Sequence, residues 1–316
     1  MTETSHSISV RLDSVEELSE VVPGSIWNFD MRQLEAGRAP VAIDAFATTS
    51  FLLLKTQLNG RTHQMGELAK DSYTFGLPVR DQAPVKFGDR EVGSDTITLF
   101  DSTEGLDAVS ESDFGAFTAS FAAEPFEAML LRLGLGPEAF RARLGSRHMR
   151  VPPGRAQALR VLMLDLLNRS LLSEDVPPSL LQGLQAQIAE ELALAFSASG
   201  DQVADRTKNR SRALRAALHY IHDKLDESIT VDELCRASAC SISTLERAFR
   251  ERFGIGPKRY LMAVRLSGVR KALLCSSREE SIGDVAARMG FWHMSKLAAD
   301  YKRMFGELPS HTSRAA

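Results

Sequence analysis

Residues 230–257, TVDELCRASACSISTLERAFRERFGIGP, and residues 282–309, IGDVAARMGFWHMSKLAADYKRMFGELP, carry one pattern twice, 52 positions apart. The matching positions are Asp232 and Asp284, Leu245 and Leu297, Phe249 and Tyr301, Phe253 and Phe305, Gly254 and Gly306, and Pro257 and Pro309. Each copy predicts a small apolar helix, a tight turn and a cationic second helix. Two such units are what a protein needs to enter two successive major grooves of DNA. The repeat therefore predicts two helix-turn-helix motifs.

The helix boundaries of the first copy follow from its capping residues. Thr230 and Glu233 form a capping-box pattern at the start of the first helix. The second helix is expected to begin at Ser241 or Ser243 and to end at Gly254. The corresponding positions of the second copy are the cap Ser281, the turn residue Gly290 and the helix start Ser295.

Ten side chains around the second helices are candidate DNA contacts. They are Ser243, Thr244, Glu246, Arg247, Arg250, His293, Met294, Ser295, Lys296 and Lys302. Arg247 is the favoured base reader, because a guanidinium can pair with both O6 and N7 of guanine. Arg250 and Arg252 are expected to bind phosphates and to set the register on the duplex.

A long helix over residues 257–274 is expected to join the two motifs. Its predicted buried side chains are Leu261, Val264, Leu266, Val269 and Leu273. Arg265, Arg270 and Lys271 are expected to point outward. This helix is predicted to separate the recognition helices by about one DNA turn, roughly 34 Å.

The block resembles the DNA-binding domain of the AraC/XylS family of bacterial transcription regulators. The family signature runs from an isoleucine-and-alanine helix through Gly-Phe to Phe-Lys-x-x-Phe-Gly-x-x-Pro. Here it reads Ile282–Ala286, then Gly290-Phe291, then Tyr301–Pro309. The resemblance covers about a third of the chain. Within the family, Gly290–His293 followed by Phe305–Ser310 is most similar to the ethanolamine-operon activators.

The second copy departs from the family pattern after its turn. Leu297 replaces an aromatic residue, Ala298 and Ala299 stand where a polar base reader is common, and His311–Ser313 replaces an aromatic–arginine pair. By analogy, the first recognition helix is expected to carry most of the sequence discrimination. The second is expected to supply phosphate contacts, with Met294 touching thymine methyl groups.

Composition and charge agree with DNA binding. Residues 206–316 hold 21 Lys and Arg against 12 Asp and Glu, whereas residues 1–205 hold 17 against 29. A basic C-terminal module attracts phosphates by counterion release. No apolar run reaches the roughly 18–20 residues that span a bilayer, the N-terminus does not resemble a signal peptide, and three cysteines predict no disulfide framework. These features predict a cytoplasmic protein with no membrane partner, associated with the nucleoid when bound.

The predicted fold is α+β. A ligand-sensing or dimerisation domain is expected over residues 1–196, β-rich to about 121 and helical over 125–196. A small cupin-like β-barrel is the expected form of its β-rich part, with Asn59-Gly60 as a type I′ hairpin turn and Gly88-Asp89 as a weaker turn. A short helix is expected near residues 13–22. A linker over 197–211 leads to an all-α double helix-turn-helix domain over 212–316.

The front domain offers no catalytic or metal-binding pattern, so neither an enzyme nor a cofactor is predicted. His6, His63 and His148 are too scattered for a three-ligand cluster, and His63 is expected to be a solvated turn residue. Cys235 is expected to pack on the inner face of its helix. The aromatic residues Phe46, Phe51, Tyr73, Phe75 and Phe87 either line a pocket or, more commonly for strand aromatics, belong to the core.

The resemblance implies a regulator that binds double-stranded promoter half-sites as a homodimer, responds to a small-molecule effector and contacts RNA polymerase, with activation as the commoner behaviour. The alternative is a ligand-independent regulator whose front domain only dimerises. Two further alternatives are a front-domain enzyme, disfavoured by the missing nucleophile and metal clusters, and a DNA-repair protein, disfavoured by the missing methyl-accepting Pro-Cys-His-type site.

Overall fold

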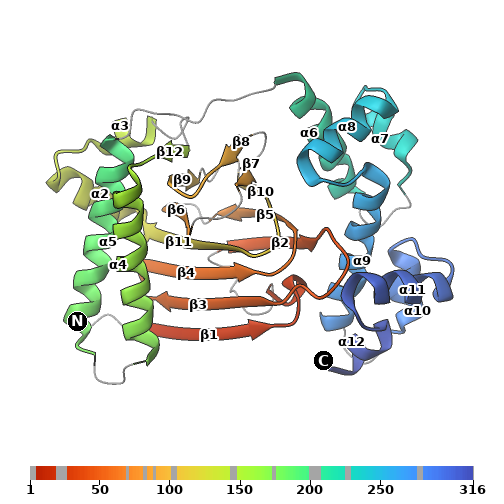
Figure 1. Cartoon of the computed structure of the whole chain (residues 1–316), viewed down its shortest axis with the longest axis horizontal. Coiled ribbons are helices and arrows are strands. Elements are labelled where there is room, and N and C mark those ends of the chain that lie inside the picture. Colours follow the sequence, from red (N-terminus) through yellow and green to blue (C-terminus); the bar gives the residue numbers. More distant parts are fainter. Residues whose placement is uncertain are drawn as a thin grey trace.

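The computed structural model describes residues 5–18, 27–68, 71–80, 84–87, 90–100, 105–142, 148–172, 176–198, 208–224, 229–275 and 280–315. Figure 1 shows β-strands at the centre, a pair of long helices along one side, and the C-terminal helices on the opposite side. The fold class is α+β, as predicted, with a β-rich front domain followed by an all-helical C-terminal domain.

The described strands form two antiparallel sheets. The seven-stranded sheet has the order β1-β3-β4-β11-β6-β9-β12, with bounds His6–Leu12, Val41–Ala47, Phe51–Leu58, Phe114–Ala122, Ser72–Pro78, Thr96–Phe100 and His148–Arg150. The five-stranded sheet has the order β2-β5-β10-β7-β8, with bounds Trp27–Gln33, Thr62–Leu68, Leu106–Ser110, Val85–Phe87 and Arg90–Val92. Because side chains alternate along a strand, each sheet turns one apolar face towards the other. The shared core includes Met31, Ile43, Leu54, Val85 and Leu106.

Helices pack on the other face of the seven-stranded sheet. The predicted helices are confirmed as α2 (Ala123–Arg132), α4 (Pro153–Leu172) and α5 (Pro178–Ala198), and a short α3 (Pro137–Ala142) joins them. Their apolar faces share one core with strand aromatics. Phe46, Phe51, Tyr73 and Phe75 belong to this core, so these four are packing residues.

One local prediction in the front domain was wrong. Asn59-Gly60 links β4 to β5, which lie in different sheets, so it is a crossover and not a hairpin turn. Near the N-terminus, β1 pairs with β3, and the 3-10 turn η1 (Val15–Glu17) follows it within the short helix predicted near residues 13–22; residues 19–22 of that prediction lie outside the described residues. Gly88-Asp89 lies outside the described residues.

The C-terminal domain contains α6 (Lys208–Asp223), α7 (Val231–Ala237), α8 (Ile242–Phe253), α9 (Pro257–Cys275), α10 (Ile282–Arg288), α11 (Met294–Phe305) and α12 (Pro309–Ala315). Two hydrophobic clusters, one for each copy of the repeat, lie on either half of α9. All five apolar side chains predicted to be buried on α9 are buried. Helix α5 ends at Ala198 and α6 begins at Lys208, and most of the predicted linker falls between them, outside the described residues.

Candidate nucleic-acid interface

The first helix-turn-helix motif consists of α7, a tight turn and α8. The Thr230 hydroxyl accepts a hydrogen bond from the Glu233 backbone N–H at 3.3 Å, and the Glu233 carboxylate accepts one from the Thr230 N–H at 2.7 Å, which confirms the capping box. Ser241 caps α8 by accepting from the Thr244 N–H. Gly254 ends α8 at φ 72°, a left-handed conformation that glycine adopts without strain.

The predicted DNA contacts of α8 share its outer face. Ser243, Arg247 and Arg250 are exposed, and Thr244 and Glu246 are half-buried. The opposite face contributes the buried side chains Leu245, Ala248, Phe249, Arg252 and Phe253. Arg250 donates from Nε to Glu246 Oε2 at 3.2 Å. Arg247 forms no ion pair with any described residue, so its guanidinium is available to an external acceptor.

The second motif consists of α10, a turn and α11. Ser281 caps α10 by accepting from the Asp284 N–H, and Gly290 takes φ 77° in the turn, both as predicted. Helix α11 begins at Met294, one residue before the predicted start. The predicted contacts His293, Met294, Ser295, Lys296 and Lys302 are all exposed. The neighbouring Trp292, which is not among the ten predicted contacts, is 75% exposed and extends this surface.

The C-terminal ends of both recognition helices are held by the front domain. Lys86 Nζ donates to the Glu251 carbonyl of α8 at 2.8 Å. The Met304 carbonyl of α11 accepts from Gln33 Nε2 and from the Gly37 N–H, both at 3.0 Å. The last carbonyls of a helix lack internal partners and carry a partial negative charge, so donors are favoured there. The opposite, N-terminal ends carry most of the predicted DNA contacts.

Arg252 was expected to bind phosphate, and this was wrong for the docked arrangement seen here. Its side chain is only 4% exposed and donates to Asp107 Oδ1 at 2.8 Å, to the Asp107 carbonyl at 3.0 Å and to the Lys86 carbonyl at 2.5 Å. Burial would raise the pKa of Asp107, but the adjacent Arg252 and His63 hold that pKa well below its usual range. Asp107 is therefore an anion that fixes α8 to the front domain.

His63, expected to be a solvated turn residue, is fully buried at the same junction. Burial lowers the pKa of its imidazole, and Asp107 offsets only part of this, so the ring is neutral at pH 7. Its Nε2 lies 2.8 Å from Asp107 Oδ1 and its Nδ1 lies 2.7 Å from the Tyr260 hydroxyl. With Nε2–H donating to the carboxylate, Nδ1 accepts from Tyr260.

Arg270 of α9 was predicted to point outward but is buried at a second junction. It donates from Nε to Ser14 Oγ at 3.0 Å and from Nη1 to Glu307 Oε1 at 2.7 Å, and it lies 3.9 Å from the buried carboxylate of Glu16. Ser267 donates to Glu16 at 2.8 Å. Burial raises the pKa of Glu16 even though Ser267 and Arg270 act in the opposite direction.

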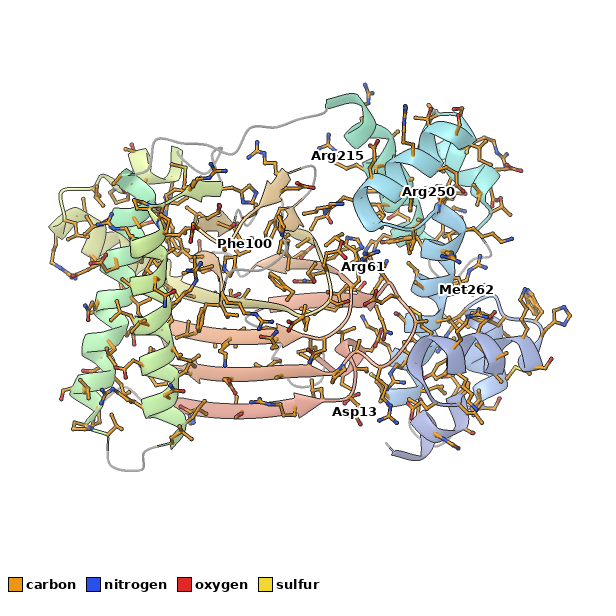
Figure 2. The ribbon with its side chains drawn as sticks, in the orientation of Figure 1. Asp13, Arg61, Phe100, Arg215, Arg250 and Met262 are labelled. Carbon is orange, nitrogen blue, oxygen red and sulfur yellow. The ribbon has the colours of Figure 1, made fainter. Side chains whose placement is uncertain are left out.

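Lys271 also turns towards the front domain, where it pairs with Asp30, whereas Arg265 is half-buried and donates to the Ile229 carbonyl. Figure 2 shows Arg61 at the boundary between the strands and the C-terminal helices, and Arg250 among those helices. The two domains thus meet through a seam of polar and ionic side chains that are buried or half-buried. That seam was not predicted from the sequence.

The front domain contains a pocket between its two sheets, and Phe87, one of the five candidate aromatics, contributes to its lining. His148 is engaged through a 3.0 Å contact between its Nδ1 and Thr98 Oγ1. Among the described residues there is no group of three His, Cys, Asp or Glu side chains suited to a metal ion. In the same part of the chain, no helix is both long and apolar enough to cross a membrane.

The C-terminal domain is similar to helix-turn-helix domains of known proteins. Residues 234–315 match the family described as a helix-turn-helix domain. The chain is 31% identical over 102 residues to the probable thc operon regulatory protein of Rhodococcus erythropolis, covering 32% of this chain and 31% of that protein. It is 32% identical over 98 residues to the XylDLEGF operon transcriptional activator of Pseudomonas putida, covering 31% of this chain and 30% of that protein. The matched segment is therefore about a third of the length of these relatives.

Two solved structures are also similar to this chain. The AraC-like transcriptional activator CuxR is 14% identical, with 90% of this chain and 100% of that chain covered, at a TM-score of 0.44. The DNA-binding domain of AdpA, solved with a target DNA, is 26% identical, with 33% of this chain and 91% of that chain covered, at a TM-score of 0.31.

Two helix-turn-helix motifs joined by one long helix define a double helix-turn-helix module. The sequence signature and the curated relatives identify it as the AraC/XylS type, so the chain carries an AraC/XylS-family helix-turn-helix domain at its C-terminus.

Proposed function

We propose that the chain is a sequence-specific transcription regulator that binds double-stranded promoter DNA through α8 and α11. One observation carries this proposal: the front domain holds the C-terminal ends of both recognition helices and leaves their N-terminal halves exposed. In helix-turn-helix proteins the N-terminal residues of the recognition helix contact base edges. The docked arrangement is therefore compatible with DNA binding.

The proposed contacts divide by chemistry. Arg247 reads guanine, and Ser243, Thr244 and Glu246 lie on the same face to contact neighbouring bases or phosphates. In the second motif, Met294 contacts thymine methyl groups. Its remaining proposed contacts, chiefly to phosphates, are His293, Ser295, Lys296 and Lys302, and Arg250 adds a phosphate contact from α8.

We further propose that the protein is a homodimer that responds to a small molecule and activates transcription, and that it is associated with the nucleoid when bound to DNA. Val161, Leu164 and Leu172 are exposed on one face of α4, where a second copy would cover them. The pocket between the sheets would hold the effector. Relatives named as transcriptional activators support activation. The proposal includes a contact with RNA polymerase, through which the bound regulator would activate transcription. The alternative keeps the dimer but gives the front domain no ligand.

Genome-wide occupancy of the native protein, mapped with and without rich carbon and nitrogen sources, tests this proposal. Peaks at one or two promoters beside a catabolic operon that change with nutrients are expected. Dozens of peaks that do not respond to nutrients would favour the ligand-independent alternative. An absence of specific peaks, together with equal affinity for a candidate promoter and random DNA in fluorescence anisotropy, would refute sequence-specific regulation.

A further inference from the structure

The pocket between the two sheets is lined almost entirely by apolar side chains. The empty space between the sheets, including the part that is open to solvent, is about 780 Å³. The polar side chains on its wall are Thr56, Gln64, Thr98 and Thr118. None of the lining residues that the structure describes carries a charge.

This lining selects the chemistry of a ligand. A charged group in the pocket would lose hydration without gaining a counter-ion from the lining, so the pocket disfavours charged ligands. Thr56 and Thr118 make no side-chain hydrogen bond with other described residues, so their hydroxyls remain available. Gln64 donates its amide protons to Ser110 Oγ at 3.0 Å and Thr62 Oγ1 at 3.3 Å, which leaves its carbonyl oxygen as an acceptor. The wall suits a neutral molecule with a hydroxyl or carbonyl group.

The five-stranded sheet separates this pocket from the DNA-binding domain. Successive side chains of a strand point to opposite faces. On β5, Gln64 lines the pocket and His63 contacts Tyr260 of α9. On β10, Leu106 lines the pocket and Asp107 binds Arg252 of α8.

Two further strands repeat this arrangement. On β2, Met31 lines the pocket and Asp30 pairs with Lys271 of α9. On β7, Phe87 lines the pocket and Lys86 donates to the Glu251 carbonyl of α8. Four strands of one sheet therefore each contact the pocket with at least one residue and the DNA-binding domain with an adjacent one.

We infer that the pocket binds an uncharged, largely apolar small molecule bearing a hydroxyl or carbonyl group, and that the five-stranded sheet transmits its binding to α8 and α9. This rests on the proposed role of the front domain as an effector sensor. A ligand in the pocket packs against Met31, Gln64 and Leu106 and stabilises this conformation of the five-stranded sheet. It therefore favours the arrangement in which Asp107, His63 and Lys86 contact the C-terminal domain. Linkage requires the reverse effect, so weakening the seam must weaken ligand binding.

Two fluorescent probes that differ by one charge test the ligand class. N-phenyl-1-naphthylamine is neutral, and 8-anilinonaphthalene-1-sulfonate is the same scaffold with a sulfonate. The protein is expected to bind one neutral probe per chain and to bind the sulfonate at least about tenfold more weakly. Ala116→Leu and Thr56→Leu, which fill the pocket from β11 and β4, should each lower affinity for the neutral probe. Ala42→Leu, on the outer face of β3, is the matched control. Far-UV circular dichroism verifies folding.

Transmission is tested at a distance from the pocket. Arg252→Ala in α8 is expected to lower affinity for the neutral probe by about fivefold or more, whereas Arg250→Ala, two residues away on the exposed face, leaves it unchanged. Equal binding of the two probes, or no effect of both pocket variants, would overturn the ligand class. Unchanged probe affinity in Arg252→Ala would overturn transmission. Promoter binding by the unmodified protein is measured separately, so a failure of the proposed DNA function is distinguished from a failure here.

Discussion

Arg250 and Arg252 stand two residues apart on α8 and are expected to respond in opposite ways to truncation. Arg252 is buried against the front domain, with three acceptor contacts to Asp107 and the Lys86 carbonyl. Arg250 is 71% exposed and pairs only with Glu246 among the described residues. Sequence alone assigns phosphate binding to both, so this pair of variants separates the two interpretations.

The magnitude for Arg252→Ala follows from its contacts. Hydrogen bonds from a charged donor contribute roughly 1.5–3 kcal/mol each. Water screens part of this, because the Asp107 side chain is 40% exposed and can be hydrated after truncation. The free energy of unfolding is therefore expected to fall by about 2–3 kcal/mol in Arg252→Ala. It should change by less than about 0.5 kcal/mol in Arg250→Ala.

Urea denaturation and DNA binding across a salt series measure both effects. If Arg250 contacts a phosphate, its loss lowers the slope of log affinity against log salt by about 0.9, whereas Arg252→Ala leaves the slope unchanged. A stable Arg252→Ala protein whose slope falls by about one would show that Arg252 binds phosphate, and it would refute the interpretation of the seam.

Three further predictions concern other parts of the molecule. Arg247→Ala should relax sequence specificity, whereas Lys302→Ala should weaken binding to all sequences almost equally. In anisotropy titrations, an equal loss of affinity for cognate and random DNA in Arg247→Ala would contradict the base-reading role. Burial lowers the pKa of His63 in the folded protein below its value of about 6.5 in the unfolded chain. The free energy of unfolding is therefore highest above pH 6.5, and it falls as the pH drops through the lowered pKa of the folded state. His63→Gln should flatten this dependence in denaturation at pH 5, 6 and 7, and an unchanged pH slope would exclude His63 as its source. Arg270→Ala should lower the free energy of unfolding by about 3–5 kcal/mol, because it leaves Glu16 buried without its cation. Glu16→Gln should lower it by less than about 1 kcal/mol, because this variant removes a buried charge and keeps an acceptor for Ser267. Similar unfolding midpoints for the two variants would contradict this asymmetry.

Local chemistry made the C-terminal domain predictable. The capping box at Thr230, the cap at Ser281 and the left-handed glycines Gly254 and Gly290 all act within a few residues of the chain. The 52-residue repeat then located both recognition helices and their exposed faces. Which of those exposed residues contact DNA remains a prediction.

The front domain was predictable only in class. Alternating strand residues and the helical segment over residues 125–196 were visible in the sequence, but strand pairing was not. Asn59-Gly60 has hairpin chemistry, yet β4 and β5 pair in different sheets, because the partner of each strand is set by packing of the whole core.

The sequence by itself determined two helix-turn-helix motifs, their caps and their exposed faces, because helix periodicity and capping depend on residues one to seven positions apart. Only the tertiary structure decided that Arg252, Arg270 and His63 join the domains. Arg252 meets Asp107 across 145 positions of the chain, and Arg270 meets Ser14 across 256. A basic residue at a helical spacing looks the same whether its acceptor is a DNA phosphate or a buried carboxylate, and the packing of two domains is what distinguishes them.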